Sequence, residues 1–187
     1  MNHILKNELV QLAEEDQKLI EKLSKSGELA DYKDELHPEI KEVFEKNTQR
    51  AKEIIENHGW PTISSVGEEG SDAMYLIVQH SVLEPDFMQS CVPLLEEQIK
   101  NNEAKGWQLA FLQDRTLMQQ GKPQIYGTQH DVNKNGIMEP YKIQNPETVN
   151  ERRLALGLEV LEEKTKQLQE NYDNALAASE ARKSKNG

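Results

Sequence analysis

The sequence predicts a mostly α-helical protein, a multi-helix domain with one small β-hairpin near residues 123–143. Apolar residues recur at helical spacings of three and four along most of the 187-residue chain. Prolines and glycines stand where helices begin and end. Ile, Tyr, Thr and Val gather only around Asn135-Gly136, a pair that is typical of hairpin turns.

The first two helices have clear limits in the sequence. Leucines from Leu5 to Leu23 form one apolar stripe, and the helix that carries them should end near Lys25 and Gly27. A second helix should run from Pro38 to His58, with Gly59 after its last turn. Its spacing predicts that Asn47 and His58 face inward with the apolar residues.

Turn residues from 59 to 67 separate these helices from a third, for which Ser71 or Asp72 is the expected N-cap. The third helix is apolar on nearly every side, which predicts burial. Pro85 should open a fourth helix, with Pro93 expected to kink it or shift its start.

A fifth helix from Trp107 to Met118 should end at Gly121. After the hairpin, a short helix should begin at Pro146 and end at Gly157, and a long one should follow from Leu161. We expect residues 1–35 to be a helical extension, 36–170 a single core domain, and 171–187 a fraying or disordered tail.

Composition excludes several classes of function. The net charge is −11 and no segment concentrates Lys and Arg, which argues against nucleic-acid binding. No apolar run is long enough for a membrane span or signal peptide, so a cytoplasmic location is expected. Cys91 is the single cysteine, which leaves no disulfide or cysteine zinc site and favours a buried thiol.

Several polar residues lie on otherwise apolar helix faces. A polar group buried without a partner is unfavourable by several kcal/mol, so His80, Asp114 and Asn47 each imply a partner or a function. His80 could equally cap the end of the third helix, and Asp114 could pair with an arginine. A metal site built from His80, Asp114 and His130 has no supporting spacing, and no metal site is predicted.

The predicted first strand carries hydrogen-bonding side chains on one face. Gln124, Tyr126, Thr128 and His130 alternate with other residues, so this face is either solvated or a binding wall. Gly127 would let a backbone or ligand approach, unless it marks a bulge. The stretch from Asp131 resembles half of a calcium loop, but Lys142 stands where a bidentate Glu is needed.

Arg152 and Arg153 offer forked donors that suit a carboxylate or a phosphate, although internal acidic residues could also pair with them. Together with these arginines, the chain carries an ordered set of short motifs: Gly59-Trp60-Pro61, Val66-Gly67, Gln79-His80, Asp114-Arg115, Gln124-x-Tyr126-Gly127-Thr128-Gln129 and Arg152-Arg153-x-x-x-Gly157-Leu158. Over about residues 40–165 this set resembles an uncharacterised bacterial family known only as a domain of unknown function. The resemblance implies that these polar positions are shared in the family, and it brings no activity or cofactor with it.

Two hypotheses follow. In the first, a pocket where the third and fifth helices meet the hairpin binds a small anionic or polar ligand. If this pocket is enzymatic, His80 is its general acid or base and Asp114 is the residue that orients His80. The expected ligand-binding residues are Arg115, Gln124, Tyr126, Thr128, Gln129, Arg152 and Arg153. In the second, these residues form a structural polar network in an interaction or immunity-type module, whose acidic surface suits a basic protein partner.

Overall fold

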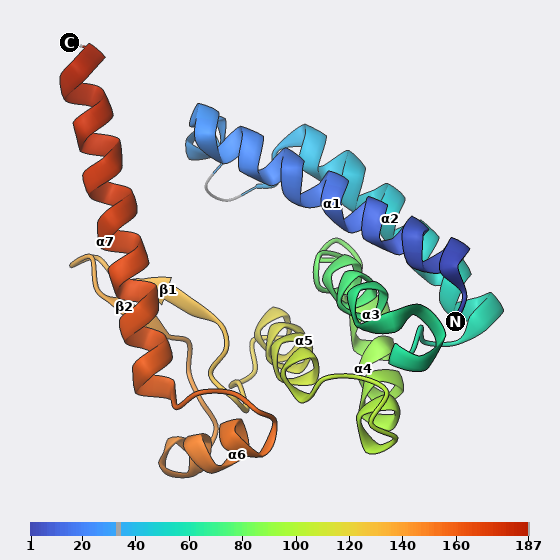
Figure 1. The fold of residues 1–187 in the computed structure, drawn as a ribbon. Coiled ribbons are helices and arrows are strands. Elements are labelled where there is room, and N and C mark those ends of the chain that lie inside the picture. The colour runs from blue at the N-terminus through green and yellow to red at the C-terminus, as the bar shows by residue number, and fades with distance from the viewer. Residues whose placement is uncertain (33–34, 187) are drawn as a thin grey trace. The chain divides into compact units, whose positions relative to one another are not determined.

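A computed structural model of the chain describes residues 1–32 and 35–186 (Figure 1). It confirms a mostly α-helical protein with one two-stranded antiparallel hairpin. The contacts within the chain divide it into two compact units, residues 1–112 and 113–187, with the boundary inside helix α5. Each unit is described separately below as unit 1 and unit 2.

Unit 1 begins with the two helices whose limits the sequence predicts. α1 spans His3–Ser26, with the Asn2 side chain as its N-cap and Gly27 in the left-handed conformation after it. α2 spans Pro38–His58, with proline in its first turn and Gly59 at its end. A short 3₁₀ helix, Glu28–Asp31, follows α1. Asn47 is buried as predicted, but His58 is exposed, because the last turn of α2 extends past the apolar core.

The third helix, α3, spans Ile63–Gln79 and begins earlier than the sequence suggests. Thr62, rather than Ser71 or Asp72, is the N-cap: its side chain accepts from the Ser65 backbone, while the Ser65 hydroxyl accepts from the Thr62 backbone N–H at 2.8 Å. Gly67 then adopts φ +74°, which bends the helix after its first turn. The turn residues in 59–67 therefore mark a kink within the helix as well as a loop before it.

Three contacts show that α1 and α3 run parallel at a constant offset. The Asn2 backbone N–H donates to the Ser65 carbonyl, Lys6 pairs with Glu69, and Asp16 meets His80. α2 runs antiparallel to α1, since Arg50 reaches Glu8 near one end and Leu23 packs with Ile40 near the other. Residues 1–35, expected as an extension, thus supply Leu5, Leu9 and Leu23 to the buried interior of unit 1.

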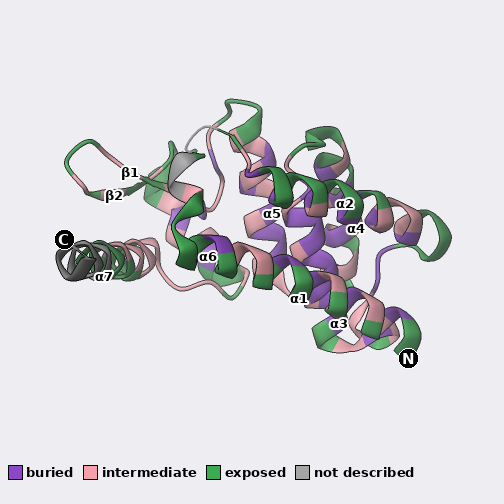
Figure 2. Ribbon diagram, turned by 90° about the horizontal axis from the view of Figure 1, so that it is seen from above, coloured by how far each residue is buried: buried purple, intermediate pink, exposed green. Residues whose placement is uncertain are grey.

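Two further helices follow α3 along the chain. α4 spans Pro85–Lys100, and Pro93 lies on its exposed side without ending it. α5 spans Gly106–Gln119 and carries the fully buried Asp114. In Figure 2, buried residues gather where the helices of unit 1 face one another, and α3 is buried over most of its length as its composition predicts. Among the described residues, no helix has both the length and the apolar character that crossing a bilayer requires.

Unit 2 contains the hairpin and the last helices. β1, His130–Val132, pairs antiparallel with β2, Met138–Pro140, with Asp131 opposite Glu139. The 3₁₀ helix Pro146–Thr148 leads into α6, Val149–Ala155, and Gly157 follows in the left-handed conformation. α7 spans Leu161–Asn186, so the backbone is helical past Ser179, while Gly187 lies outside the described residues.

The outer edge of β2 is closed by α7. The Met138 backbone N–H donates to Oε1 of the Gln169 side chain at 2.6 Å, and Nε2 of Gln169 donates to the Gly136 carbonyl. Pro140 has no N–H to offer to another strand. The unpaired edge of a strand can pair with another chain, and Gln169 and Pro140 prevent this at β2. The hairpin is also too short to be stable alone.

Burial predicts that Cys91 is chemically inert in the folded protein. Its side chain is inaccessible on α4, and burial raises the pKa of the thiol to about 12, so the thiolate is scarce at neutral pH. We expect a thiol-specific reagent to label Cys91 only after urea unfolds the chain. Labelling of the native protein at the rate of a small free thiol would contradict this burial.

Candidate functional site

The segment Gln124–Gln129, here the QIYGTQ loop, is not the strand that the sequence predicts. It forms no strand: it has an isolated bridge between Gln124 and Ile143, and the Tyr141 backbone N–H donates to the Gln129 carbonyl at 3.1 Å. The β-prone residues in this segment favoured a strand, but their backbone groups bond to side chains from other elements of unit 2. All the predicted site residues except His80 take part in or adjoin this arrangement.

Asp114 on α5 holds the N–H groups of the loop. Its Oδ1 accepts from the backbone of Ile125 at 2.7 Å and of Tyr126 at 3.0 Å, and its Oδ2 accepts from Thr128 at 2.8 Å. Hydrogen bonds to a charged acceptor are stronger than neutral ones. One buried carboxylate thus replaces the partner strand that these donors would otherwise need.

Glutamine side chains close the two ends of the loop. The Gln124 amide oxygen accepts from the Gln129 backbone at 2.7 Å, and its NH₂ group donates to the carbonyls of Gln129 and Tyr141. Arg115 donates to the Gln129 amide oxygen at 3.0 Å through Nη2. Gln129 in turn donates to the Thr128 hydroxyl at 3.1 Å. Gln124 and Thr128 of the predicted polar face therefore bond within unit 2.

The two arginines of α6 hold the carbonyl groups of the same loop. Arg152 donates to the Ile125 carbonyl at 2.8 Å and, on its other side, to Thr148, Gln144 and Asn145. Arg153 is only 1% exposed and donates to the carbonyls of Tyr126, Gly127 and Glu159. Burial lowers the pKa of Arg153, against the opposing effect of Glu159. These donors bond to backbone carbonyls, so Arg153 has no exposed face for an anion.

Gly127 is required where the loop turns. Its φ is +65°, and a Cβ built there would lie 2.7 Å from Ile143 Cδ1 and 3.0 Å from Leu161 Cδ1. The close approach expected at this glycine is therefore made by two apolar side chains of unit 2. Chemically, the network produces a rigid, irregular loop at a fixed position on α5 and α6.

His80 lies in unit 1, and its carboxylate partner is Asp16 rather than Asp114. Nδ1 of His80, at the C-cap of α3, is 2.9 Å and 3.0 Å from the two oxygens of Asp16 on α1. The Asp16 side chain is fully buried and that of His80 is 17% exposed. Because a carboxylate only accepts, this contact assigns the hydrogen to Nδ1 and leaves the lone pair of a neutral imidazole on Nε2.

Neighbouring residues fix the ring of His80. Phe44 stacks against it with ring centres 4.8 Å apart, and the next residue, Ser81, accepts a hydrogen bond from Thr48 on α2 at 2.9 Å. Nε2 has no hydrogen-bond partner within the part of the chain that the structure describes. An oriented imidazole with an unoccupied nitrogen can accept or donate a proton.

Asp16 is the residue that sequence reasoning missed, although the sequence contains the signal. It follows Leu9 by seven residues and precedes Leu23 by seven, so it lies on the same stripe of α1. Asp114 is a candidate because it is an acidic residue on an apolar helix face, and Asp16 meets the same criterion. Asn47, a polar residue on the apolar face of α2, is buried as well: it is 3% exposed, and its Nδ2 has no hydrogen-bond partner among the described residues.

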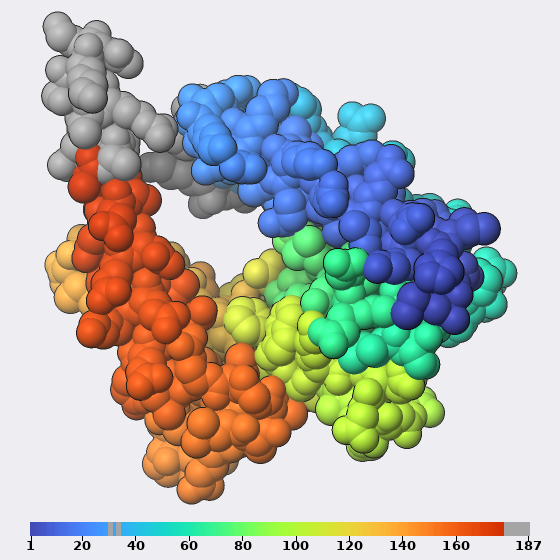
Figure 3. Space-filling model, in the orientation of Figure 1, coloured from blue at the N-terminus to red at the C-terminus, as the bar shows by residue number. Residues whose placement is uncertain are grey.

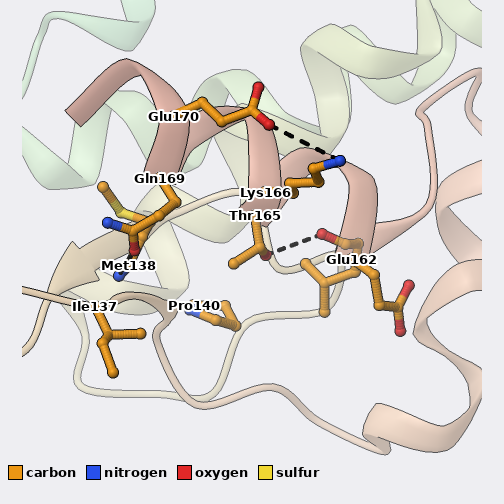
Figure 4. A pocket seen from close by; sticks show the side chains of 9 residues that line it. Ile137, Met138, Pro140, Glu162, Thr165, Lys166, Gln169 and Glu170 are labelled. Atoms are coloured by element: carbon orange, nitrogen blue, oxygen red, sulfur yellow. Dashed lines mark hydrogen bonds and ion pairs between the residues drawn. The ribbon is translucent and has the colours of Figure 1, made fainter. Parts of the chain in front are cut away.

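A groove of about 510 Å³ lies between the hairpin and α7 in unit 2 (Figure 4). Residues from both elements line it, namely Ile137, Met138, Pro140, Leu161, Glu162, Thr165, Lys166, Gln169 and Glu170. Thr165 of this lining also contacts His130: His130 Nε2 lies 3.0 Å from the Thr165 hydroxyl, which donates to the Leu161 carbonyl. No group of three His, Cys, Asp or Glu residues in the described chain is arranged to hold a metal ion.

Removing Arg153 should destabilise the protein strongly. Arg153→Ala deletes hydrogen bonds to three carbonyls and leaves them buried without partners, so we expect a loss of about 3–5 kcal/mol in the free energy of unfolding. Arg50→Ala is the control, since its ion pairs with Glu8 and Glu53 are partly exposed and should contribute about 1 kcal/mol or less. Urea unfolding followed by circular dichroism compares the two, and equal losses would contradict a structural role for Arg153.

The free energy of unfolding should fall in mild acid because His130 takes up a proton more readily in the unfolded chain than in the folded one. Burial lowers the pKa of His130, and the positive charges of Arg153 and Lys164 add to this, although the Thr128 carbonyl opposes it. The unfolded chain therefore binds a proton more readily, and the stability contributed by neutral His130 is lost as pH falls below the ordinary value of about 6.5. Urea unfolding between pH 7.5 and 5.5 should show a shallower dependence for His130→Gln. The exposed His58→Gln should keep the wild-type slope, and parallel curves for all three proteins would refute the prediction.

Comparison with known proteins places the chain in a family. No curated protein and no solved structure matches it. One family model, described as a family of unknown function (DUF6624), matches residues 3–176 and so includes α1, the QIYGTQ loop and most of α7. Because this match extends over nearly the whole chain, the protein belongs to the DUF6624 family.

Proposed function

We propose that the protein binds a small polar ligand beside His80 and uses this imidazole as a general acid or base. The observation that carries the proposal is the contact between His80 Nδ1 and the buried carboxylate of Asp16. A carboxylate in this position fixes the tautomer and orientation of the ring and stabilises the imidazolium that forms when Nε2 accepts a proton. Asp16 is then a positioning residue, and His80 is the residue that touches the ligand.

The burial of the pair supports this role over a surface ion pair. Taking a carboxylate out of water is unfavourable by several kcal/mol unless it is well paired, and a purely apolar residue would fill the same place more favourably. The stacked Phe44 restricts the ring further. A buried carboxylate that holds a partly exposed imidazole is the arrangement expected of a proton-transfer site.

The ligand class differs from the sequence hypothesis in one respect. Arg152 and Arg153 were expected to bind an anion, but their donors bond to carbonyls of the QIYGTQ loop. We therefore propose a hydrogen-bonding ligand at His80 without a role for these arginines. We retain the proposal of a bacterial, cytoplasmic protein, for which the unpaired, buried Cys91 is suitable.

A second candidate function is an interaction or immunity-type module. The specific observation in its favour is the network on the QIYGTQ loop, where Asp114, Arg152 and Arg153 serve the backbone. A loop held in this way can present its partly exposed residues, Ile125 and Tyr126, to a protein partner with little loss of conformational entropy on binding. In that case His80 and Asp16 would be a structural pair.

Ligand-dependent thermal stability separates the two candidates. We would measure the melting temperature of the wild type, His80→Ala and Asp16→Asn against divalent metals, nucleotides, sugar phosphates and carboxylic acids. A ligand at one hundred times its Kd stabilises a protein by about 2.7 kcal/mol, and this gain should vanish in His80→Ala. His58→Ala, on the exposed end of α2, is the matched control and should respond like the wild type.

His80→Ala leaves the buried Asp16 carboxylate without its partner, so we expect a loss of about 3–5 kcal/mol in stability under either candidate function. The proposal predicts in addition that the variant loses the ligand response. Asp16→Asn should bind more weakly and shift the pH dependence of binding, because an amide does not stabilise the imidazolium. A ligand that stabilises His80→Ala as much as the wild type would place binding elsewhere. No response of the folded wild type to any of the compounds would favour the interaction module.

A further inference from the structure

A surface groove follows the seam between α1 and α3 in unit 1. Its volume is about 580 Å³, and a hollow of about 300 Å³ beside Lys6 shares some of its lining and continues it along α1. The floor is apolar and consists of Val10, Ala13, Ala73 and Leu76. Figure 3 shows α1, in dark blue, beside α3, in green, along this seam.

The shape of the groove suits another helix. α1 and α3 are parallel, so the groove between them is straight, and from Lys6 to Gln17 it extends about 16 Å, or three helical turns. Ala13 and Ala73 are small, which lets a third helix come close to both. Recognition of an amphipathic helix by an apolar groove uses anchors three and four residues apart.

The rim of the groove is acidic. Glu14, Glu69 and Asp72 line it, and each contacts a lysine: Lys18, Lys6 and Lys105, respectively. The side chains of Glu14 and Glu69 are 58% and 73% exposed. Exposed ion pairs of this kind contribute about 1 kcal/mol or less, so a cation from a partner can replace the lysine without a large loss.

The charge of the protein is concentrated in the unit that holds this groove. Residues 1–112 contain 22 of the 33 acidic residues and 11 of the 22 basic ones, whereas residues 113–187 contain 11 of each. The whole net charge of −11 therefore belongs to unit 1, and unit 2 is neutral. A field of one sign around a groove accelerates encounter with a partner of opposite charge.

From these observations we infer that the α1/α3 groove binds a basic amphipathic helix of another protein. Apolar side chains of this helix lie on Ala13, Ala73 and Leu76, while its lysines or arginines meet Glu14, Glu69 and Asp72. The groove lining does not include His80, so the inference stands independently of the proposed acid–base site.

Fluorescence anisotropy with a labelled synthetic peptide tests the inference on the full chain. The probe is a helical peptide with leucines at helical spacing and lysines at its other positions. We expect the Kd to rise roughly tenfold or more when Glu14→Lys and Glu69→Lys are combined, since two attractive contacts become repulsive. Circular dichroism of the variant checks that it is folded.

The matched control combines Glu42→Lys and Glu56→Lys, which makes the same change in net charge at exposed positions of α2. Its Kd should stay within about twofold of the wild type when measured at physiological salt, where distant charges are screened. A peptide with the leucines replaced by serines, and one with the lysines replaced by glutamates, should bind at least tenfold more weakly.

Three results would overturn the inference. If both double variants raised the Kd equally, the peptide would respond to net charge alone. If the serine peptide bound as tightly as the leucine peptide, the apolar floor would have no part in recognition. A dimer in solution that only the groove variant dissociates would make a second copy of this chain the occupant.

Discussion

The constraint on which unit 2 depends is that every buried backbone group needs a hydrogen-bond partner. The QIYGTQ loop has neither a helix nor a strand ladder to supply such partners. Asp114 provides acceptors for its N–H groups, and Arg152 and Arg153 provide donors for its carbonyls. Because opposite charges approach the loop from α5 and α6, the same contacts that satisfy the backbone also join these helices to the hairpin.

This constraint explains why so many polar residues are buried in a small unit. Gln124 is fully buried and Arg153 is nearly so, and both would be unfavourable there without partners. A network that is fully satisfied is rigid and specifies one arrangement, whereas the loss of one member leaves several buried groups unpaired. The short hairpin, with its edge closed by Gln169, relies on this rigid support.

The buried polar groups of unit 1 need partners too, but there the partner of the buried carboxylate is a histidine side chain. Asp16 is as buried as Asp114, and its partner is the side chain of His80. Asp114 accepts hydrogen bonds from backbone N–H groups of the loop, whereas Asp16 contacts Nδ1 of His80 and leaves Nε2 of that ring unused. Unit 1 also holds the net negative charge and the α1/α3 groove, so its chemistry and its surface are both distinct from those of the neutral unit 2.

By itself, the sequence determined the elements whose formation is local. Pro38 and Gly59 bound α2 because proline fits a first helical turn and glycine a helix end. Gly136 lies in the hairpin turn because glycine readily adopts the positive φ, +79°, that it has there. Only the tertiary structure decided which residues the buried polar groups bond to. Residues 124–129 are β-prone, yet contacts with Asp114 and the arginines, more than ten residues away, override that preference. The pairing of His80 with Asp16, 64 residues apart, likewise depends on the parallel packing of α1 and α3, which no local pattern encodes.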